Sequence, residues 1–180
     1  MIFETERLIV RKWKPSDAAA LFEYCGNPEV TKYLTFPTYK SIQDAHDRIS
    51  DMLKRYKSNS KYNIDYAITI KDSDIAIGSV GLNQFDEMHG RTLEIGYILN
   101  PKYQGKGYMT ETLVGLFRYI KANDLAWRII ARHDVTNEKS GAVMRRAGMK
   151  LEVIARKGAS NNVHKRADAA TYSILVEEIN

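Results

Sequence analysis

The chain has 180 residues and few of the features that would place it outside ordinary globular proteins. Its only cysteine is Cys25, so no disulfide can form within the chain, and a cytoplasmic location is expected. It has no apolar run long enough to span a membrane, and its first residues do not resemble a secretory signal. The four histidines and the cysteine show none of the spacings typical of metal ligands, so no metal is expected.

Internal repeats, low-complexity tracts and long charge runs are also missing. This length is enough for one full hydrophobic core, and residues 1–180 are expected to form a single domain. The net charge of +5 favours anionic ligands. No run of five or more basic residues marks a nucleic-acid-binding segment, so direct binding of nucleic acid is not expected.

Hydrophobic periodicity predicts an alternation of strands and helices along the whole chain. The expected strands cover residues 7–13, 64–71, 75–85, 93–99, 128–134, 150–156 and 169–177, and the expected helices cover residues 18–25, 41–56, 109–120 and 137–147. A turn is expected at residues 86–90. The strands at 93–99 and 128–134 flank a helix, so they should be parallel, while the strands before them should be antiparallel. The fold class is therefore mixed α/β.

The most informative stretch lies between the strand at 93–99 and the helix that follows it. Gly105 and Gly107 lie in the short connection between this strand and the helix. Glycine has no Cβ atom, so several backbone N–H groups can converge there on one point, at the positive end of the helix dipole. This arrangement predicts a site for a phosphate or pyrophosphate, although the glycines could also serve only a structural turn.

Two common phosphate-binding motifs do not fit this loop. A P-loop ends in Gly-Lys-Ser/Thr, whereas Tyr108 follows Gly107. A dinucleotide fingerprint needs a third glycine, which is absent after Met109. Gln104, Gly107 and Met109 occupy the positions of Gln/Arg-x-x-Gly-x-Gly/Ala, and the loop closely resembles the acyl-CoA loop of the GNAT acetyltransferases. Met109 departs from the small residue usual in that family.

A second segment strengthens the resemblance. Asn137, Ser140 and Val143, followed by Gly148-Met149, resemble the family segment in which the Asn and the Ser face the pantetheine and sulfur. Residues 5–11, 94–97 and 108–111 are similar to the branch of ribosomal-protein N-terminal (alanine or serine) acetyltransferases. The resemblance covers essentially the whole chain. It implies a mostly antiparallel sheet flanked by helices, with a V-shaped splay between two parallel strands.

The resemblance implies an enzyme that transfers an acetyl group from acetyl-CoA, as cosubstrate, to a primary amine. The amine attacks directly in a ternary complex, without a covalent acyl-enzyme. Residues 104–110 would hold the pyrophosphate, residues 97–99 would hold the pantetheine, and Asn137 with Ser140 would hold the sulfur end. The implied cofactor-binding residues are Tyr97, Ile98, Leu99, Gln104, Gly105, Lys106, Gly107, Tyr108, Met109, Thr110, Asn137 and Ser140.

Catalysis then requires a base for the ammonium proton and a donor for the leaving thiolate. Glu94 matches a glutamate that some family members use as base; the alternative is a surface carboxylate paired with Arg or Lys. Many family members carry a tyrosine where this chain has Met144, which leaves Ser140 as the nearest hydrogen-bond donor for the sulfur. The alternatives are the phenols of Tyr97, Tyr108 and Tyr172 and a proton relay through His133.

The acceptor is not specified by the sequence. It is the α-amine of a ribosomal or other protein, or a small amine such as a polyamine, an aminoglycoside or an amino acid. The acceptor groove is expected between the helical segments before residue 60 and the polar stretch at 157–165. A non-catalytic acyl-CoA-binding or RNA-associated module is the rival interpretation. The protein is expected to be a monomer or a homodimer.

Overall fold

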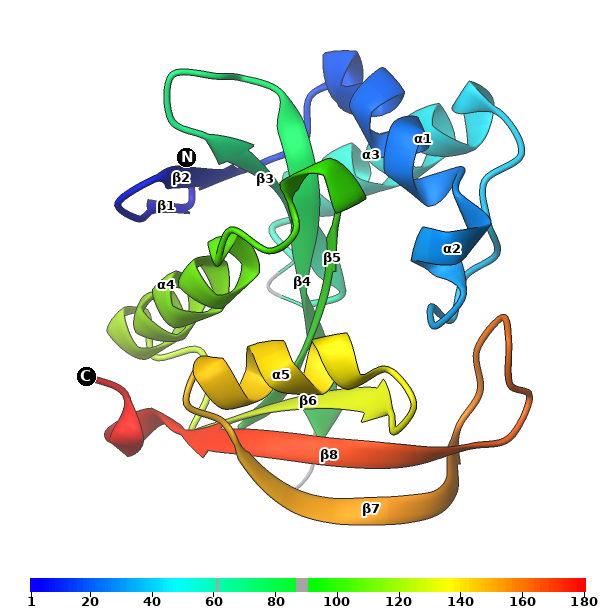
Figure 1. Cartoon of the computed structure of the whole chain (residues 1–180). Helices are drawn as coiled ribbons and strands as arrows, with labels where there is room; N and C mark the ends of the chain where they lie inside the picture. The colour runs from blue at the N-terminus through cyan, green and yellow to red at the C-terminus, as the bar shows by residue number, and fades with distance from the viewer. Residues whose placement is uncertain (61, 87–90) are drawn as a thin grey trace.

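The computed structural model describes residues 1–60, 62–86 and 91–180, so most of the predicted turn at 86–90 lies outside the described residues. The described strands form one sheet in the order β1-β2-β3-β4-β5-β6-β8-β7 (Figure 1). They are β1 Phe3–Glu4, β2 Leu8–Arg11, β3 Ile64–Ile70, β4 Ala76–Asp86, β5 Thr92–Leu99, β6 Arg128–Asp134, β7 Lys150–Ala159 and β8 Ala167–Leu175.

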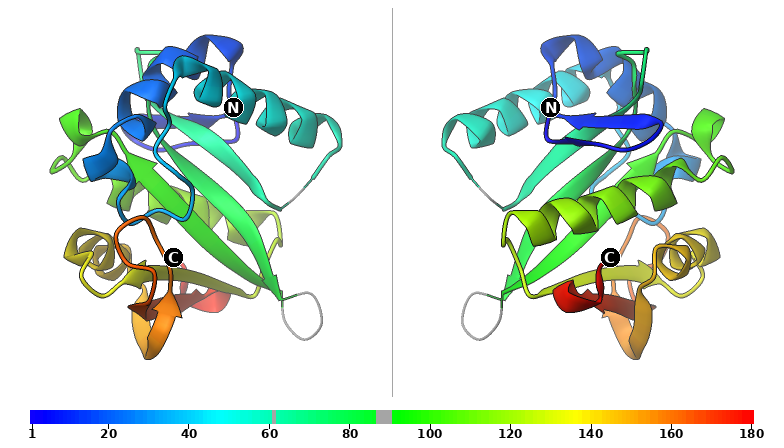
Figure 2. Two further views of the ribbon diagram at one scale, coloured as in Figure 1. Left: turned by 90° about the vertical axis from the view of Figure 1, so that its right-hand side faces the viewer. Right: turned by 90° about the vertical axis from the view of Figure 1, so that its left-hand side faces the viewer.

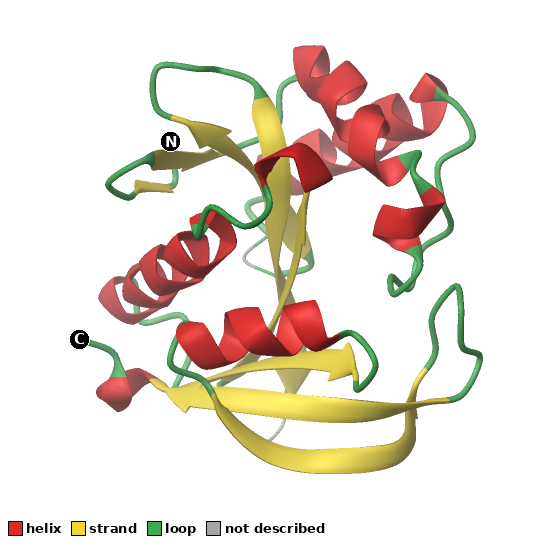
Figure 3. Ribbon diagram, in the orientation of Figure 1, coloured by secondary structure: helices red, strands yellow, loops and turns green. Residues whose placement is uncertain are grey.

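Helices cover both faces of the sheet (Figure 3). The α-helices are α1 Ala18–Cys25, α2 Pro28–Thr31, α3 Ile42–Lys57, α4 Tyr108–Ala122 and α5 Glu138–Arg146, and the 3-10 turns are η1 Pro15–Asp17, η2 Pro101–Tyr103 and η3 Val176–Glu178. Helices α1, α2 and α3 lie on one face, and α4 crosses the opposite face, where it contacts α5 (Figure 2).

All of the predicted strands and helices are confirmed, with boundaries shifted by a few residues. The sequence pattern missed β1 and α2, and it ended β7 too early, since this strand runs on to Ala159. A signal for α2 was present. Asn27 is its N-cap, with Oδ1 accepting a hydrogen bond from the Glu29 amide at 3.0 Å, and Pro28 occupies the first turn.

The core lies between α4 and the sheet on one side and between α1, α3 and the sheet on the other. The predicted stripe of α4 is buried, namely Met109, Leu113, Leu116, Phe117 and Ile120. Cys25 is also buried in the core, at 1% exposure. Burial raises the pKa of its thiol to about 12, so the thiolate that nucleophilic chemistry needs is scarce at neutral pH.

The central feature of the sheet is the separation of β5 from β6. Strand β5 pairs with β4 along its whole length, but it is parallel to β6 over only three residue pairs, which end at Glu94 and Ile130. Beyond that point β6 pairs only with β8, and the two halves of the sheet diverge (Figure 2). The predicted splay is confirmed, and it begins at Glu94.

The C-terminal end of β6 is held by a buried carboxylate. Asp134, 4% exposed, accepts hydrogen bonds from the Thr136 amide (2.9 Å), the Thr136 hydroxyl (2.7 Å) and Asn161 Nδ2 (2.9 Å). His164 Nδ1 lies 2.7 Å from the same carboxylate. Burial opposes ionisation, but the hydrogen bonds from His164, Thr136 and Asn161 outweigh it and hold the pKa of Asp134 well below its usual value. This carboxylate therefore fixes the β7–β8 connection to the end of β6.

This arrangement predicts how stability depends on acid. Because the pKa of Asp134 is depressed in the folded state, its contribution is complete above about pH 4 and is lost as the pH falls below that value. We expect Asp134→Asn to lower the free energy of unfolding at pH 7 by about 2 kcal/mol, and to flatten the loss of stability below about pH 4. Urea unfolding measured from pH 7 to pH 3 checks both.

The matched control is Asp72→Asn, at an exposed position in a turn with φ +65°, a conformation that asparagine also tolerates. This variant should change neither the free energy of unfolding at pH 7 nor its decrease below about pH 4. Equal behaviour of the two variants would contradict the assigned role of Asp134.

Candidate active site

The loop before α4 has the backbone conformation that its glycines were expected to supply. Gly105 has φ +77° and Gly107 has φ +78°, both in the left-handed region that other residues rarely adopt. A Cβ atom at Gly105 would meet nothing within 4 Å, and one at Gly107 would meet only Arg7 Nη2, at 3.5 Å. The glycines are therefore required by the backbone path, and the space above them is open.

Most amides of this loop have no hydrogen-bond partner among the residues that the structure describes. The Gln104 amide donates to the Pro101 carbonyl, and the Glu111 amide donates to the Gly107 carbonyl. Between these two bonds, no described residue accepts a hydrogen bond from the amides of residues 105–110. Unpaired amides at the start of a helix with 15 residues form a cradle that can hold an anion, the arrangement that the glycine spacing predicts.

The side chains of the loop make contacts of their own. The Met109 side chain is 5% exposed and belongs to the core, so only its amide can face a ligand, which accounts for its departure from a small residue. The Gln104 side-chain amide donates to the Leu99 carbonyl at 3.2 Å, and this bond links the loop to the end of β5. The Lys106 ammonium lies over the Tyr103 ring, at 5.7 Å from its centroid, and the Thr110 side chain is half-buried.

Arg7 adds a positive charge that the sequence did not place here. Its guanidinium lies over the Tyr108 ring at 4.7 Å and forms an ion pair with Glu111 at 2.6 Å. Burial opposes ionisation of Glu111, but hydrogen bonds from Thr5 and Arg7 outweigh it and lower its pKa. These contacts tie the first turn of α4 to the N-terminal segment. No local pattern could reveal them, because the partners are about a hundred positions apart.

Backbone groups of β5 point into the gap beside β6. The Asn100 amide donates to the Ile77 carbonyl of β4 at 2.9 Å, and alternate residues of an antiparallel strand bond to the same neighbour. Ile98 therefore bonds to β4, opposite Ser79, whereas the amides of Tyr97 and Leu99 point to the side where β6 has diverged. Of the three predicted strand residues, two present free backbone donors to the gap.

Two hydroxyl groups meet across this gap. The Tyr97 phenol lies 2.9 Å from Ser140 Oγ and donates to the Ser140 carbonyl at 3.0 Å. Burial raises the pKa of Tyr97, so the phenol stays protonated at neutral pH. Asn137 is the N-cap of α5, with Oδ1 accepting from the Ser140 amide at 3.4 Å. The structure thus brings together three of the residues that the sequence predicted for one site, Tyr97, Asn137 and Ser140.

Glu94 lies at the vertex of the splay. Its two carboxylate oxygens accept hydrogen bonds from Arg132 Nε at 2.8 Å and Nη2 at 2.9 Å. Glu94 is thus a paired carboxylate, the alternative to a catalytic base that its sequence context left open. The pair joins β5 to β6 just where their backbones part. The hydrogen bonds to Glu94 raise the pKa of Arg132.

The other side chains considered for protonating the thiolate, at positions 133, 144 and 172, are held by contacts within the fold. Met144 is 1% exposed in the core. Tyr172 accepts a hydrogen bond from Arg145 at 2.9 Å and stacks on His133, whose ring centroid lies 5.7 Å away. His133 Nδ1 lies 2.7 Å from the Asp134 carbonyl, and its Nε2 is buried without a partner among the described residues, against Gly141. None of these contacts reaches the glycine loop.

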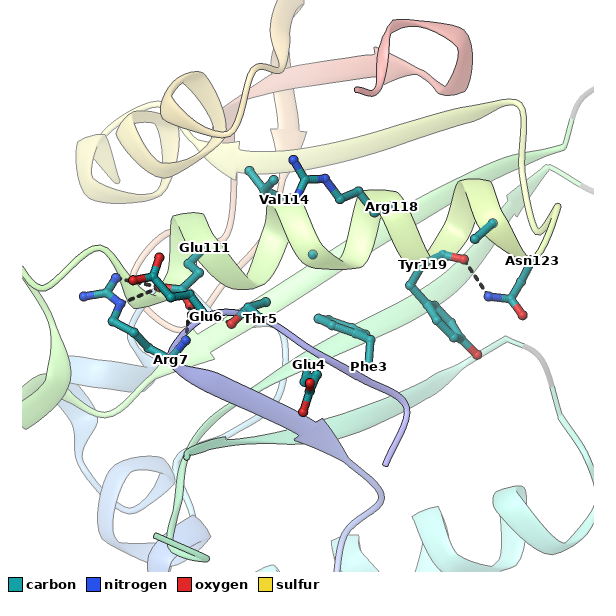
Figure 4. Close-up of a pocket in the computed structure, with 12 residues that line it drawn as sticks. Phe3, Glu4, Thr5, Glu6, Arg7, Glu111, Val114, Arg118, Tyr119 and Asn123 are labelled. Carbon is teal, nitrogen blue, oxygen red and sulfur yellow. Dashed lines mark hydrogen bonds and ion pairs between the residues drawn. The ribbon is translucent and has the colours of Figure 1, made fainter. Parts of the chain in front are cut away.

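A separate open groove of about 740 Å³ runs along the outer side of α4, beside β1 (Figure 4). Its lining includes Phe3, Glu4, Arg7, Glu111, Arg118 and Tyr119. It shares Arg7 and Glu111 with the edge of the glycine loop but none of the predicted catalytic residues. Elsewhere in the described chain, no helix is long and apolar enough to cross a membrane, and no group of three or more His, Cys, Asp or Glu residues could hold a metal ion.

Residues 7–150 match the family model for the acetyltransferase (GNAT) domain, and the chain belongs to this family of acetyl-CoA-dependent N-acetyltransferases. The N-acetyltransferase YoaA of Bacillus subtilis (strain 168), itself described as uncharacterized, is 31% identical over 97% of this chain and 96% of its own length. The crystal structure of a GNAT acetyltransferase from Bacillus anthracis is similar with a TM-score of 0.84, at 27% identity over 97% of this chain and 98% of that one.

A second solved structure contains coenzyme A. It is RimL, the ribosomal L7/L12 alpha-N-protein acetyltransferase, in complex with coenzyme A. It matches with a TM-score of 0.81, at 21% identity over 95% of each chain. At this identity the match shows the shared fold alone.

The loop geometry predicts the effect of a single methyl group. We expect Gly107→Ala to weaken binding of coenzyme A at least tenfold, because its Cβ would enter the open space beside the free amides and its φ would disfavour the present loop conformation. Isothermal titration calorimetry with coenzyme A measures the change. The strain should also lower the free energy of unfolding by about 1–2 kcal/mol.

Gly148→Ala is the control matched for strain. Gly148 has φ +93° at the end of α5, and a Cβ there would meet only Ile174 Cδ1, at 3.9 Å. This variant should lose a similar amount of stability and keep its affinity for coenzyme A. Unchanged affinity in Gly107→Ala would refute the assignment of the loop as the diphosphate site.

Proposed function

We propose that this enzyme transfers the acetyl group of acetyl-CoA to the N-terminal α-amine of a protein, a ribosomal protein being the first candidate. Acetyl transfer follows from the family, and the acceptor is our inference. The observation on which the choice of acceptor rests is the bidentate ion pair between Glu94 and Arg132. A sequence relative with a ribosomal-protein acceptor supports it, the ribosomal protein uS5-alanine N-acetyltransferase of Escherichia coli (strain K12), which is 24% identical over 84% of this chain and 79% of its own length.

In this proposal the amides of residues 105–110 bind the diphosphate of acetyl-CoA, and Arg7 adds positive charge beside them. The pantetheine extends along β5 and hydrogen-bonds to Tyr97 and Leu99 as an added strand in the gap. The thioester then lies between Glu94 and Ser140. One of the free β5 amides stabilises the negative charge that develops on the thioester oxygen when the amine attacks.

Glu94 takes the proton of the acceptor amine, directly or through a water molecule. Both oxygens of this carboxylate already accept a hydrogen bond from Arg132, so fewer lone pairs remain to accept the proton of the amine. Such a base is best suited to an amine that loses its proton easily. At pH 7.5 about one third of α-amines, with pKa about 7.8, are neutral, against about 0.1% of lysine side chains, with pKa about 10.4. The ion pair therefore favours an α-amine over a lysine side chain or another alkyl amine of high pKa.

An acceptor panel tests this function. Acetyl-CoA is incubated at pH 7.5 with three amines, and free coenzyme A is measured with a thiol reagent. The amines are peptides beginning with alanine or serine, the same peptides with a blocked N-terminus and one lysine, and spermidine. We expect the free α-amines to react fastest, and Glu94→Gln to lower their kcat/KM about a hundredfold.

Asp124→Asn is the matched control, since Asp124 forms an exposed ion pair with Arg91 at 2.9 Å, away from the acceptor opening, and its change should leave the rate unaltered. Faster acetylation of lysine or spermidine than of α-amines would refute the proposed acceptor. Tight binding of acetyl-CoA without release of coenzyme A from any acceptor would favour a non-catalytic module.

The leaving thiolate is stabilised by Ser140 in this proposal. Either hydroxyl can donate in the hydrogen bond between Tyr97 and Ser140. The phenol has one hydrogen, which is donated to the Ser140 carbonyl in the structure. When this hydrogen turns to Ser140 Oγ, 2.9 Å away, the serine hydrogen is free to point toward the sulfur. The phenol can keep this role throughout the reaction, because burial raises its pKa and it retains its proton. Tyr97 thus orients Ser140 and supports it as charge develops on the sulfur.

A double-mutant cycle tests the link between the two hydroxyls. We expect Ser140→Ala to lower kcat about a hundredfold, and Tyr97→Phe about tenfold, while the affinity for acetyl-CoA changes little. The double variant should be no slower than Ser140→Ala, because the phenol acts through the serine. If the two losses multiply in the double variant, the residues act independently.

A further inference from the structure

The connection between β7 and β8 reaches across the molecule to the N-terminal half. We call residues 160–166 the strap. Asn162 Nδ2 donates to two carbonyl oxygens, of Thr31 at 2.9 Å and of Phe36 at 2.8 Å. The Val163 amide donates to the Lys32 carbonyl at 3.1 Å. The two bonds of Asn162 join segments that lie 131 and 126 positions apart.

The strap does not need these contacts to hold its own shape. Asn161 Oδ1 accepts hydrogen bonds from the amides of Val163 (3.0 Å) and His164 (2.8 Å), which closes a local turn. Asn161 and His164 also bind the buried carboxylate of Asp134. The strap is therefore anchored at the end of β6, and Asn162 is an additional tie that extends from this anchor to α2.

The tie lies at the open end of the V formed by β5 and β6. The two strands part at Glu94. Helix α2 and the strap meet where the V is widest (Figure 1). Beside them, the Tyr33 phenol donates a hydrogen bond to the Thr136 carbonyl at 3.4 Å. These two segments are the ones expected to border the acceptor. They are joined here by hydrogen bonds, so they do not form the two separate walls of an open slot.

We infer that Asn162 is a specificity-determining residue. By tying the strap to α2 it closes the side of the acceptor opening and restricts entry to amines without bulky side chains next to the amino group. The inference rests on the proposed function, because it assumes that the acceptor reaches Glu94 through this opening. Both hydrogens of one amide group hold both carbonyls, so replacement of a single side chain removes two of the three hydrogen bonds of this tie and leaves only that of the Val163 amide. Asn162 is exposed, and its loss leaves the core intact.

The test compares two peptide acceptors in the full-length enzyme. Both begin with a free serine; one continues with glycines and the other with two tryptophans. We expect Asn162→Ala to raise the ratio of kcat/KM for the tryptophan peptide over the glycine peptide at least tenfold. The rate with the glycine peptide should stay within about threefold of the original. Hydrogen exchange of the Val163 amide should accelerate at least tenfold, while the amides of β8 exchange as before.

Asn123→Ala is the matched control, because Asn123 is also an exposed asparagine whose Nδ2 donates to a backbone carbonyl, that of Tyr119 at 2.8 Å. It should leave the ratio and the exchange rates unchanged. An unchanged ratio of kcat/KM in Asn162→Ala, with normal turnover of the glycine peptide, would overturn the role of Asn162 in specificity but not the proposed acceptor. Unchanged exchange at Val163 would overturn the tie. Failure of the unaltered enzyme to acetylate either peptide would instead overturn the proposed acceptor, and the assigned role with it.

Discussion

Three residue pairs join β5 to β6, and the rest of the candidate site depends on how few they are. If the parallel pairing continued, β6 would occupy the amides of Tyr97 and Leu99, and no strand-like ligand could enter. Because the pairing stops at Glu94, β5 keeps free donors along one edge while β4 holds it firmly along the other. The same short contact sets the Glu94–Arg132 ion pair at the vertex, where the two halves of the sheet are closest.

The connection between these strands carries the second part of the site. A parallel pair needs a crossover, and here the crossover is α4, whose N-terminus lies just after the end of β5. The left-handed glycines allow the chain to turn from strand to helix with its amides exposed. The positive end of the helix therefore faces the same opening as the free edge of β5. One topological unit positions both an anion cradle and an extended hydrogen-bonding edge, and a diphosphate with a long amide-containing arm requires both.

The N-terminal and C-terminal halves approach the candidate site from opposite sides. Arg7 and Thr5 hold the first turn of α4 through Glu111, and the strap meets α2 through Asn162. The strap is set on the end of β6, next to the start of α5. The acceptor side that we propose is thus built from segments distant in sequence, whereas the cofactor side is largely one continuous stretch. This difference explains why the family was clear from the sequence and the acceptor was not.

Local patterns determined the strands, the helices and the glycine loop, because hydrophobic period, capping residues and missing Cβ atoms act over a few neighbouring positions. They singled out the glycine loop and the start of α5 as parts of one site. Only the tertiary structure decided where β5 and β6 part, and that Glu94 is paired with Arg132. It also decided that the Tyr97 phenol meets Ser140, that a guanidinium lies beside the glycine loop, and that the strap is tied to α2. These contacts join residues far apart in the chain, and their energies depend on packing that no single segment contains.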